Sequence, residues 1–189
     1  MSNDISRGSD MARLAVGVEA PQELIISGQN WKPVWRLDKW HRSEDFDLGF
    51  APDETLEIEN NLLVSGGTNL ALLFLIGDVN LNAYGSGDAN LRVASGSTAA
   101  TSGDQDLVGE GPVSKGMDAT YPQVIGNSVI WRSTFESGEA NFTWNEVGVV
   151  NGAGTPDGDV TRLLNRKVQN FGTKASGSTW QLTLTILVT

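Results

Sequence analysis

Apolar and polar side chains alternate without interruption over residues 179–188. One face of this stretch carries Trp180, Leu182, Leu184, Ile186 and Val188, and the other carries Thr179, Gln181, Thr183 and Thr185. A period of two is typical of a β-strand that is buried on one face. Shorter stretches of strand-like pattern predict further strands over residues 90–94, 128–135 and 160–168.

Residues 60–78 follow a helical period instead. The apolar residues that recur at helical spacing are Leu70, Leu73 and Phe74. Thr68 is a suitable N-cap and Gly77 a suitable C-terminal stop. We expect the pair Gly66 and Gly67 to separate this helix from the apolar residues before it. The helix should close one end of a β core.

Glycine-rich turns lie between these elements, and together they predict a mainly β fold. We expect an antiparallel β-sandwich or jelly-roll-like domain with one short helix. Residues 97–105 should add a single helical turn, and residues 113–124 should be loop. Residues 1–30 have no sustained period and predict an extended N-terminal arm, so that residues 31–189 form a single β domain.

Composition narrows the classes of function. The chain has no cysteine, which excludes disulfides, thiolate zinc sites and a cysteine nucleophile. Its net charge of −10 disfavours binding to phosphate backbones and anionic membranes, and fits docking on a basic patch of a partner. The first ten residues lack the apolar stretch of a secretory signal, and the longest apolar run is too short to span a bilayer. We expect neither nucleic acid nor membrane as a partner.

Residues with the chemistry for catalysis are sparse. The single histidine, His41, lies in a charged stretch, which argues against a histidine-based triad or zinc site. Carboxylate pairs that could cleave a glycosidic bond are Glu139 with Glu146 and Asp104 with Asp106. Any acidic β protein offers such pairs, and the turn over residues 152–159 has too few ligands for calcium. We therefore predict no enzyme activity, no cofactor and no metal.

Glu146 occupies an unusual position for a carboxylate. With a period of two, it follows Ala140, Phe142 and Trp144 on one face. A carboxylate on an apolar face is costly unless it is paired, and Arg166 also follows apolar residues on its own strand. We predict a structural ion pair between Glu146 and Arg166, with Arg132 and Arg92 as alternative partners. A bulge near Gly148 that turns Glu146 into solvent is the alternative.

A cluster of tryptophans and basic residues opens the β domain. Trp31, Trp35 and Trp40 alternate with Lys32, Arg36, Lys39 and Arg42. This spacing occurs in platforms for single-stranded nucleic acid or sugars, and also where tryptophans anchor a core or a subunit interface. Acidic residues follow at once, which favours the second interpretation. We assign the three tryptophans to a partner interface.

Seven stretches, taken in order, resemble a family of tailed-bacteriophage structural proteins. They are NNLLVSGGTNLALLFLIG, NLRVASGSTAATSGDQDL, MDATYP, VIWRSTF, EANFTWNEVGVVN, LLNRKVQNFGTK and TWQLTLTILV. The likeness covers about residues 60–189 and lies in the ordered set, since no single motif is diagnostic. Members of this family are virion or tail-fibre-like proteins without a more specific role.

The resemblance implies a place in the virion. Phage particles commonly carry jelly-roll cement proteins on the capsid exterior, often as trimers. We therefore expect a capsid cement or decoration protein, a homotrimer that stabilises the shell by binding the major capsid protein through its arm and β domain. The alternative is a tail-fibre or tail-adaptor protein, with host glycans as candidate ligands.

Overall fold

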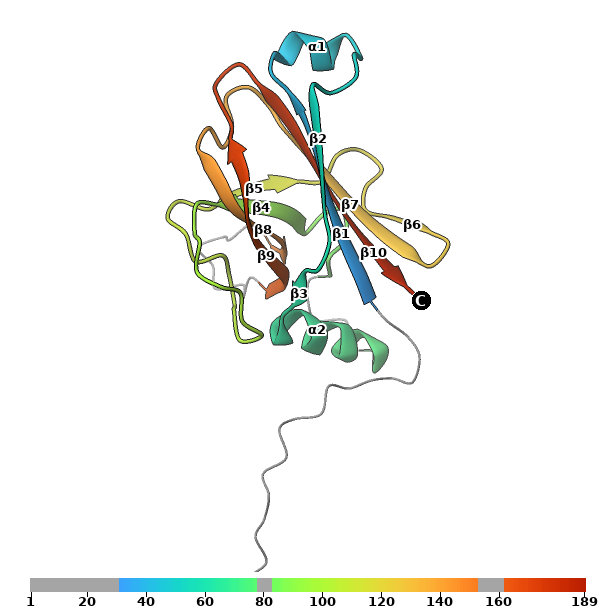
Figure 1. Cartoon of the computed structure of the whole chain (residues 1–189). Coiled ribbons are helices and arrows are strands. Elements are labelled where there is room, and N and C mark those ends of the chain that lie inside the picture. The colour runs from blue at the N-terminus through green and yellow to red at the C-terminus, as the bar shows by residue number, and fades with distance from the viewer. Residues whose placement is uncertain (1–30, 78–82, 153–161) are drawn as a thin grey trace, which may run out of the picture.

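The computed structural model describes residues 31–77, 83–152 and 162–189. Within them, two five-stranded antiparallel sheets pack face to face as a β-sandwich (Figure 1). The predicted mainly β fold is therefore confirmed. The predicted arm, residues 1–30, lies outside the described residues.

The first sheet has the strand order β2–β1–β10–β7–β6. Its strands are β1 (Trp31–Trp40), β2 (Glu54–Ile58), β6 (Gln123–Ile125), β7 (Ser128–Phe135) and β10 (Thr179–Val188). The alternating strand β10 lies at the centre, paired with β1 on one side and β7 on the other. Its register with β1 pairs Trp31 with Val188, so the start of β1 and the end of β10 lie at the same end of the sandwich.

The second sheet has the strand order β3–β9–β8–β4–β5. Its strands are β3 (Leu62–Leu63), β4 (Ala89–Ala94), β5 (Val113–Gly116), β8 (Thr143–Asn151) and β9 (Arg162–Thr173). The short strand β5 lies within residues 113–124, where a loop was expected, and β6 begins there and ends one residue beyond, at Ile125. They are too short for their alternation to be visible in the sequence.

Aromatic side chains from both sheets meet in the core. Trp144 of the second sheet packs edge-on against Phe135 and Trp180 of the first, with ring centroids 4.8 Å apart in both pairs. The indole N–H of Trp144 donates to the carbonyl of Ala140 at 2.8 Å. Its one polar atom is therefore satisfied, and the rings supply a large part of the buried apolar surface that joins the sheets.

Two helices lie at opposite ends of the sandwich, α1 (Ser43–Asp47) and α2 (Ser65–Leu75) (Figure 1). Helix α2 is the predicted helix, and it ends at Leu75, just before the expected stop at Gly77, which has a φ of +82°. Residues 97–105 contain no helical turn and form loop instead. No described helix has the length and hydropathy of a membrane span.

The start of α2 differs from the prediction. The helix begins at Ser65, so Gly66 and Gly67 do not interrupt it, and Thr68 lies inside its first turn. A Cβ atom at Gly67 would be 2.5 Å from the Cα atom of Leu164 on β9. This glycine is therefore required for close packing of α2 on the second sheet rather than for a break.

The neighbouring glycine offers a matched test of this packing. Gly67→Ala should lower the free energy of unfolding by about 1 to 3 kcal/mol, since the new methyl group must displace backbone. Gly66→Ala meets only an ordinary contact at 3.7 Å from the carbonyl oxygen of Leu163, and should be neutral or slightly stabilising. Urea unfolding of both variants measures the difference. Equal effects would show that α2 does not pack this closely.

Candidate functional site

Residues 95–112, which connect β4 to β5, lie over the outer face of the second sheet. Leu107 of this loop packs with Val150 and Leu163 in a second apolar cluster, separate from the main core. Charged side chains lie beside this cluster under the same loop. This is where the structure places most of the carboxylates that the sequence singled out.

Trp144 and Glu146 do not share a face of β8, contrary to the prediction from strict alternation. The register between β8 and β9 shifts between these two residues. Trp144 therefore points into the main core, whereas Glu146 points to the outer face, as Val150 does. A second register shift pairs the neighbours Val149 and Val150 with β9 residues that are two positions apart. It places Leu164 in the core and Arg166 on the outer face of the sheet.

Glu146 and Arg166 nevertheless form the predicted ion pair on that outer face. The Nε and Nη2 atoms of Arg166 each lie 2.7 Å from Oε2 of Glu146, and both side chains are fully buried. The other oxygen, Oε1, accepts the backbone N–H of Gly109 at 2.5 Å. The alternative prediction was right that a bulge turns Glu146 away from the core face, and wrong that the carboxylate reaches solvent, because the loop covers it.

The alternative partners of Glu146 are engaged elsewhere. Arg132 donates to Asp118 at 3.0 Å, on the outer side of the first sheet. Arg92 donates from Nη1 to Asp106 at 2.5 Å. Each of these arginines thus has a carboxylate of its own, and Glu146 is left to Arg166.

Arg166 also binds the loop directly. Its Nη1 donates to Asp104 at 2.7 Å and to the carbonyl of Ala99 at 3.5 Å, and its Nη2 donates to the carbonyl of Thr98 at 3.0 Å. Burial lowers the pKa of Arg166, but its hydrogen bonds and charge interactions with Asp104 and Glu146 together raise the pKa by more, so it lies above its ordinary value. The guanidinium therefore stays charged and clamps the loop to the sheet. We call these three contacts and the Glu146 pair the Arg166 clamp.

Two glycines allow the loop to close over Glu146. A Cβ atom on Gly96 would fall 2.6 Å from the backbone nitrogen of Gly109, and one on Gly109 would fall 2.8 Å from the Oε1 atom of Glu146. No other residue type fits at these crossings without moving the backbone. Glycines in this small-residue loop thus serve the close approach of two chain segments above a buried carboxylate.

The remaining sequence-predicted chemistry is dispersed. Glu139 is bound by Lys115 at 2.7 Å, apart from Glu146, so the first carboxylate pair does not share one site. Asp104 and Asp106 are each bound by a different arginine. His41 is exposed, with its Nδ1 atom 3.7 Å from Asp53. Within the described residues, no three acidic or histidine side chains gather closely enough to hold a metal ion.

A buried lysine was not found by sequence reasoning. The Nζ atom of Lys174 donates to the carbonyls of Glu136 and Ser178, at 2.7 and 2.8 Å, and to Oδ1 of Asn141 at 3.1 Å. It ties the turn before β8 to the turn before β10. Burial lowers its pKa to about 8, against the opposing charge of Glu139. A single lysine after a strand gives no sequence signal of such an environment.

The assignment of all three tryptophans to a partner interface is wrong for two of them. Trp35 is 0% exposed because it points from β1 into the core. Trp40 is 7% exposed, packs against Phe46 of α1 and donates to the carbonyl of Phe50 at 2.8 Å. Trp31, at the start of β1, is 47% exposed. Neither Trp35 nor Trp40 can therefore stack on a partner.

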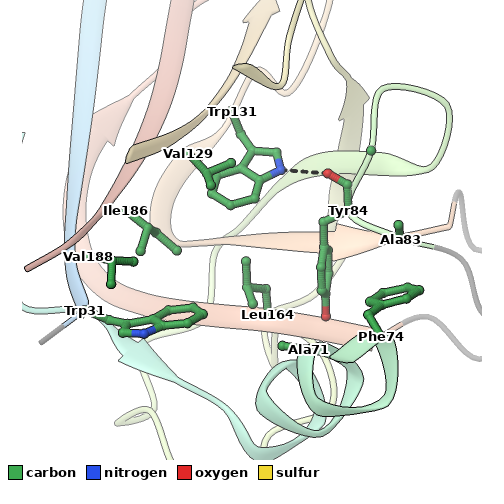
Figure 2. Close-up of a pocket in the computed structure, with 11 residues that line it drawn as sticks. Trp31, Ala71, Phe74, Ala83, Tyr84, Val129, Trp131, Leu164, Ile186 and Val188 are labelled. Atoms are coloured by element: carbon green, nitrogen blue, oxygen red, sulfur yellow. Dashed lines mark hydrogen bonds between the residues drawn. The ribbon is translucent and has the colours of Figure 1, made fainter. Parts of the chain in front are cut away.

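Trp31 borders an apolar pocket of about 380 Å³ between α2 and the ends of β1, β7 and β10 (Figure 2). The walls are Trp31, Ala71, Phe74, Ala83, Tyr84, Gly85, Val129, Trp131, Leu164, Ile186 and Val188. The indole N–H of Trp131 donates to the carbonyl of Tyr84 at 2.9 Å, and the Tyr84 hydroxyl donates to the carbonyl of Arg162 at 3.2 Å. Burial holds the pKa of Tyr84 well above its ordinary value.

The outer side of α2 is also apolar. Leu75 and Ile76 are 82% and 81% exposed, and Leu72 is exposed beside them. The helix contains no charged residue. Exposed polar residues occur only before Leu70, and from there the helix is apolar on every side. Such a segment is normally covered, and adjoining exposed apolar side chains mark a binding surface. We call Leu72, Leu75 and Ile76, together with the adjacent pocket, the apolar end.

The sequence carried a signal of this surface that its analysis missed. Polar residues normally cover the solvent-facing side of a surface helix, and residues 70–76 have none.

Comparison of the chain with protein-family models, curated proteins and solved structures gave no match.

The Arg166 clamp predicts a large cost for losing its anion. Glu146→Ala should lower the free energy of unfolding by about 3 to 5 kcal/mol, because Arg166 would keep its buried charge without its main partner. Glu139→Ala is the matched control: it breaks a partly exposed pair and should cost about 1 kcal/mol or less. Chemical denaturation of both variants gives the values. Similar losses would contradict a buried clamp.

Lys174 predicts a pH dependence at alkaline pH. The ordinary pKa of lysine, 10.5, applies to the unfolded chain, and the folded value is about 8. Between these values the unfolded chain binds more protons, so the free energy of unfolding should rise with pH, by up to about 3 kcal/mol. The difference between wild type and Lys174→Met isolates this residue. If the difference does not rise between pH 8 and 10.5, the three oxygen acceptors keep the amine charged.

Proposed function

We propose that the protein is a structural component of a tailed-bacteriophage particle, a capsid cement or decoration protein that binds the major capsid protein. The observation that carries this proposal is the exposed apolar side of α2. Helix α2 lies at one end of the sandwich (Figure 1). Leu75 and Ile76, at the end of this helix, face solvent almost completely. An apolar surface of this kind is stabilised when another protein covers it.

The rest of the domain supports an assembly role. Its buried charges hold loop and sheet together and offer no carboxylate oxygen of Glu146 to a substrate. The net charge of −10 suits docking on a basic surface, which would speed the association of the two proteins. The resemblance to phage structural proteins begins with the stretch that contains α2. Binding by this helix is thus consistent with both lines of argument.

A place in the tail remains the alternative within the same class. The case for a tryptophan shelf that binds host glycans is weakened, since Trp35 and Trp40 are buried. A tail adaptor would still use an apolar surface, and it would differ mainly in copy number. A homotrimer, the other part of this proposal, would place three such surfaces on one shell site.

Copy number in purified particles tests the proposal. Quantitative mass spectrometry against the major capsid protein should give a ratio near one to one for a cement protein. A ratio of a few per hundred would place the protein in the tail instead. Its absence from particles made in cells that express it would overturn the virion role.

The apolar side of α2 predicts which variants fail to enter particles. Leu75→Asp combined with Ile76→Asp should reduce incorporation about tenfold or more, because two charges would be buried at the interface. Val124→Asp combined with Ile125→Asp is the control, since these exposed apolar residues lie on the edge strand β6. Mass spectrometry of particles grown with each variant reads the effect. Equal incorporation of both would show that α2 is not the contact.

A further inference from the structure

The chemistry of the walls restricts what the pocket in the apolar end can bind. Its walls are aromatic and aliphatic, with Trp131 on one side of the space and Trp31 and Leu164 on the other (Figure 2). The polar side-chain groups of Trp131 and Tyr84 are already engaged within the chain. Small-molecule sites normally keep a few polar groups to orient the ligand, and these two are not available. The pocket therefore suits aliphatic side chains.

The chain itself supplies such side chains close by. Strand β1 begins at Trp31, on the rim of the pocket, so the preceding residues must leave from that rim. Residues 24–26 read Leu-Ile-Ile and are the nearest apolar run before it. Residues 28–30 read Gly-Gln-Asn, and glycine and asparagine favour a turn. Four residues separate Ile26 from Trp31, so the five steps between their Cα atoms span at most roughly 17 Å when extended.

We propose that residues 24–26 fold back and fill the pocket of their own chain. Helix α2 forms one wall of the pocket, and its eleven residues span about 16 Å. The extended tether is about as long as this wall, so residues 24–26 can reach across the pocket. The short tether gives the segment a high effective concentration at its own pocket, which favours it over the same segment of a second copy. Covering Trp31, Phe74 and Leu164 removes apolar surface from water. This inference does not depend on the proposed function.

Disulfide trapping in the full-length protein tests it cleanly, because the chain has no cysteine. Leu24, Ile25 and Ile26 are each changed to Cys in combination with Ala71→Cys on the pocket wall. Two cysteines join only when their Cα atoms come within about 7 Å. At least one pair should form a disulfide within the monomer under mild oxidation, seen as a faster band on a non-reducing gel.

Two controls make the result decisive. The same arm cysteines combined with Leu48→Cys, an exposed residue that follows α1 at the opposite end of the sandwich, should cross-link at least about tenfold more slowly, since Leu48 lies away from the pocket. Val16→Cys with Ala71→Cys tests whether any part of the arm reaches the pocket equally well. Equal rates for the pocket pairs and either control would overturn the proposal. A product of dimer size would also overturn it, in favour of a second copy.

Discussion

The guanidinium of Arg166 is the constraint on which much of the second sheet depends. It is fully buried, and a charge in that position is tolerated only when its donors are satisfied. Glu146 satisfies it from the neighbouring strand, and Asp104 with two carbonyls satisfies it from the loop above. The loop must therefore lie on the sheet for the arginine to be buried. Folding of the loop and burial of the charge become one event.

The position of α2 depends on the same loop. The N–H of Ser65, at the start of the helix, donates to the carbonyl of Ser102 at 2.8 Å. The N–H of Val64 donates to Leu164 on β9 at 3.1 Å, and Gly67 packs on the same residue. The clamp thus fixes a loop, and the loop and β9 together fix the helix. The apolar side of α2 is therefore held in place by contacts of the helix with the loop and with β9.

Sequence reasoning succeeded where one local rule decides the outcome. The alternation in residues 179–188 predicted β10, because a strand buried on one face has no other pattern. Glu146 and Arg166 were paired from the cost of burying one charge alone. Strict alternation predicted the wrong face of the sheet for both side chains. The register shifts beside Trp144 and Val149 reverse the alternation, and they depend on pairing between strands, which one strand's sequence does not show. Asp104 was missed as the third member, because a loop brings it from 62 residues away.

The burial of the three tryptophans also could not be predicted from the sequence of one strand. Trp31, Trp35 and Trp40 look equivalent in sequence, yet their environments differ because β1 is central to a sheet only after β2 and β10 have paired with it. Trp35 then faces the core, Trp40 meets α1, and Trp31 is left at the rim. Only tertiary pairing decides which tryptophan remains available to another molecule.

In the proposed function, the clamped part of the domain is a support and the apolar side of α2 is the contact. Hydrogen–deuterium exchange of the free protein and of the same protein on particles compares the two regions directly. We predict slower exchange over residues 68–76 on particles, with residues 96–109 unchanged. Equal exchange over residues 68–76 in both states, with protection elsewhere, would contradict the claim.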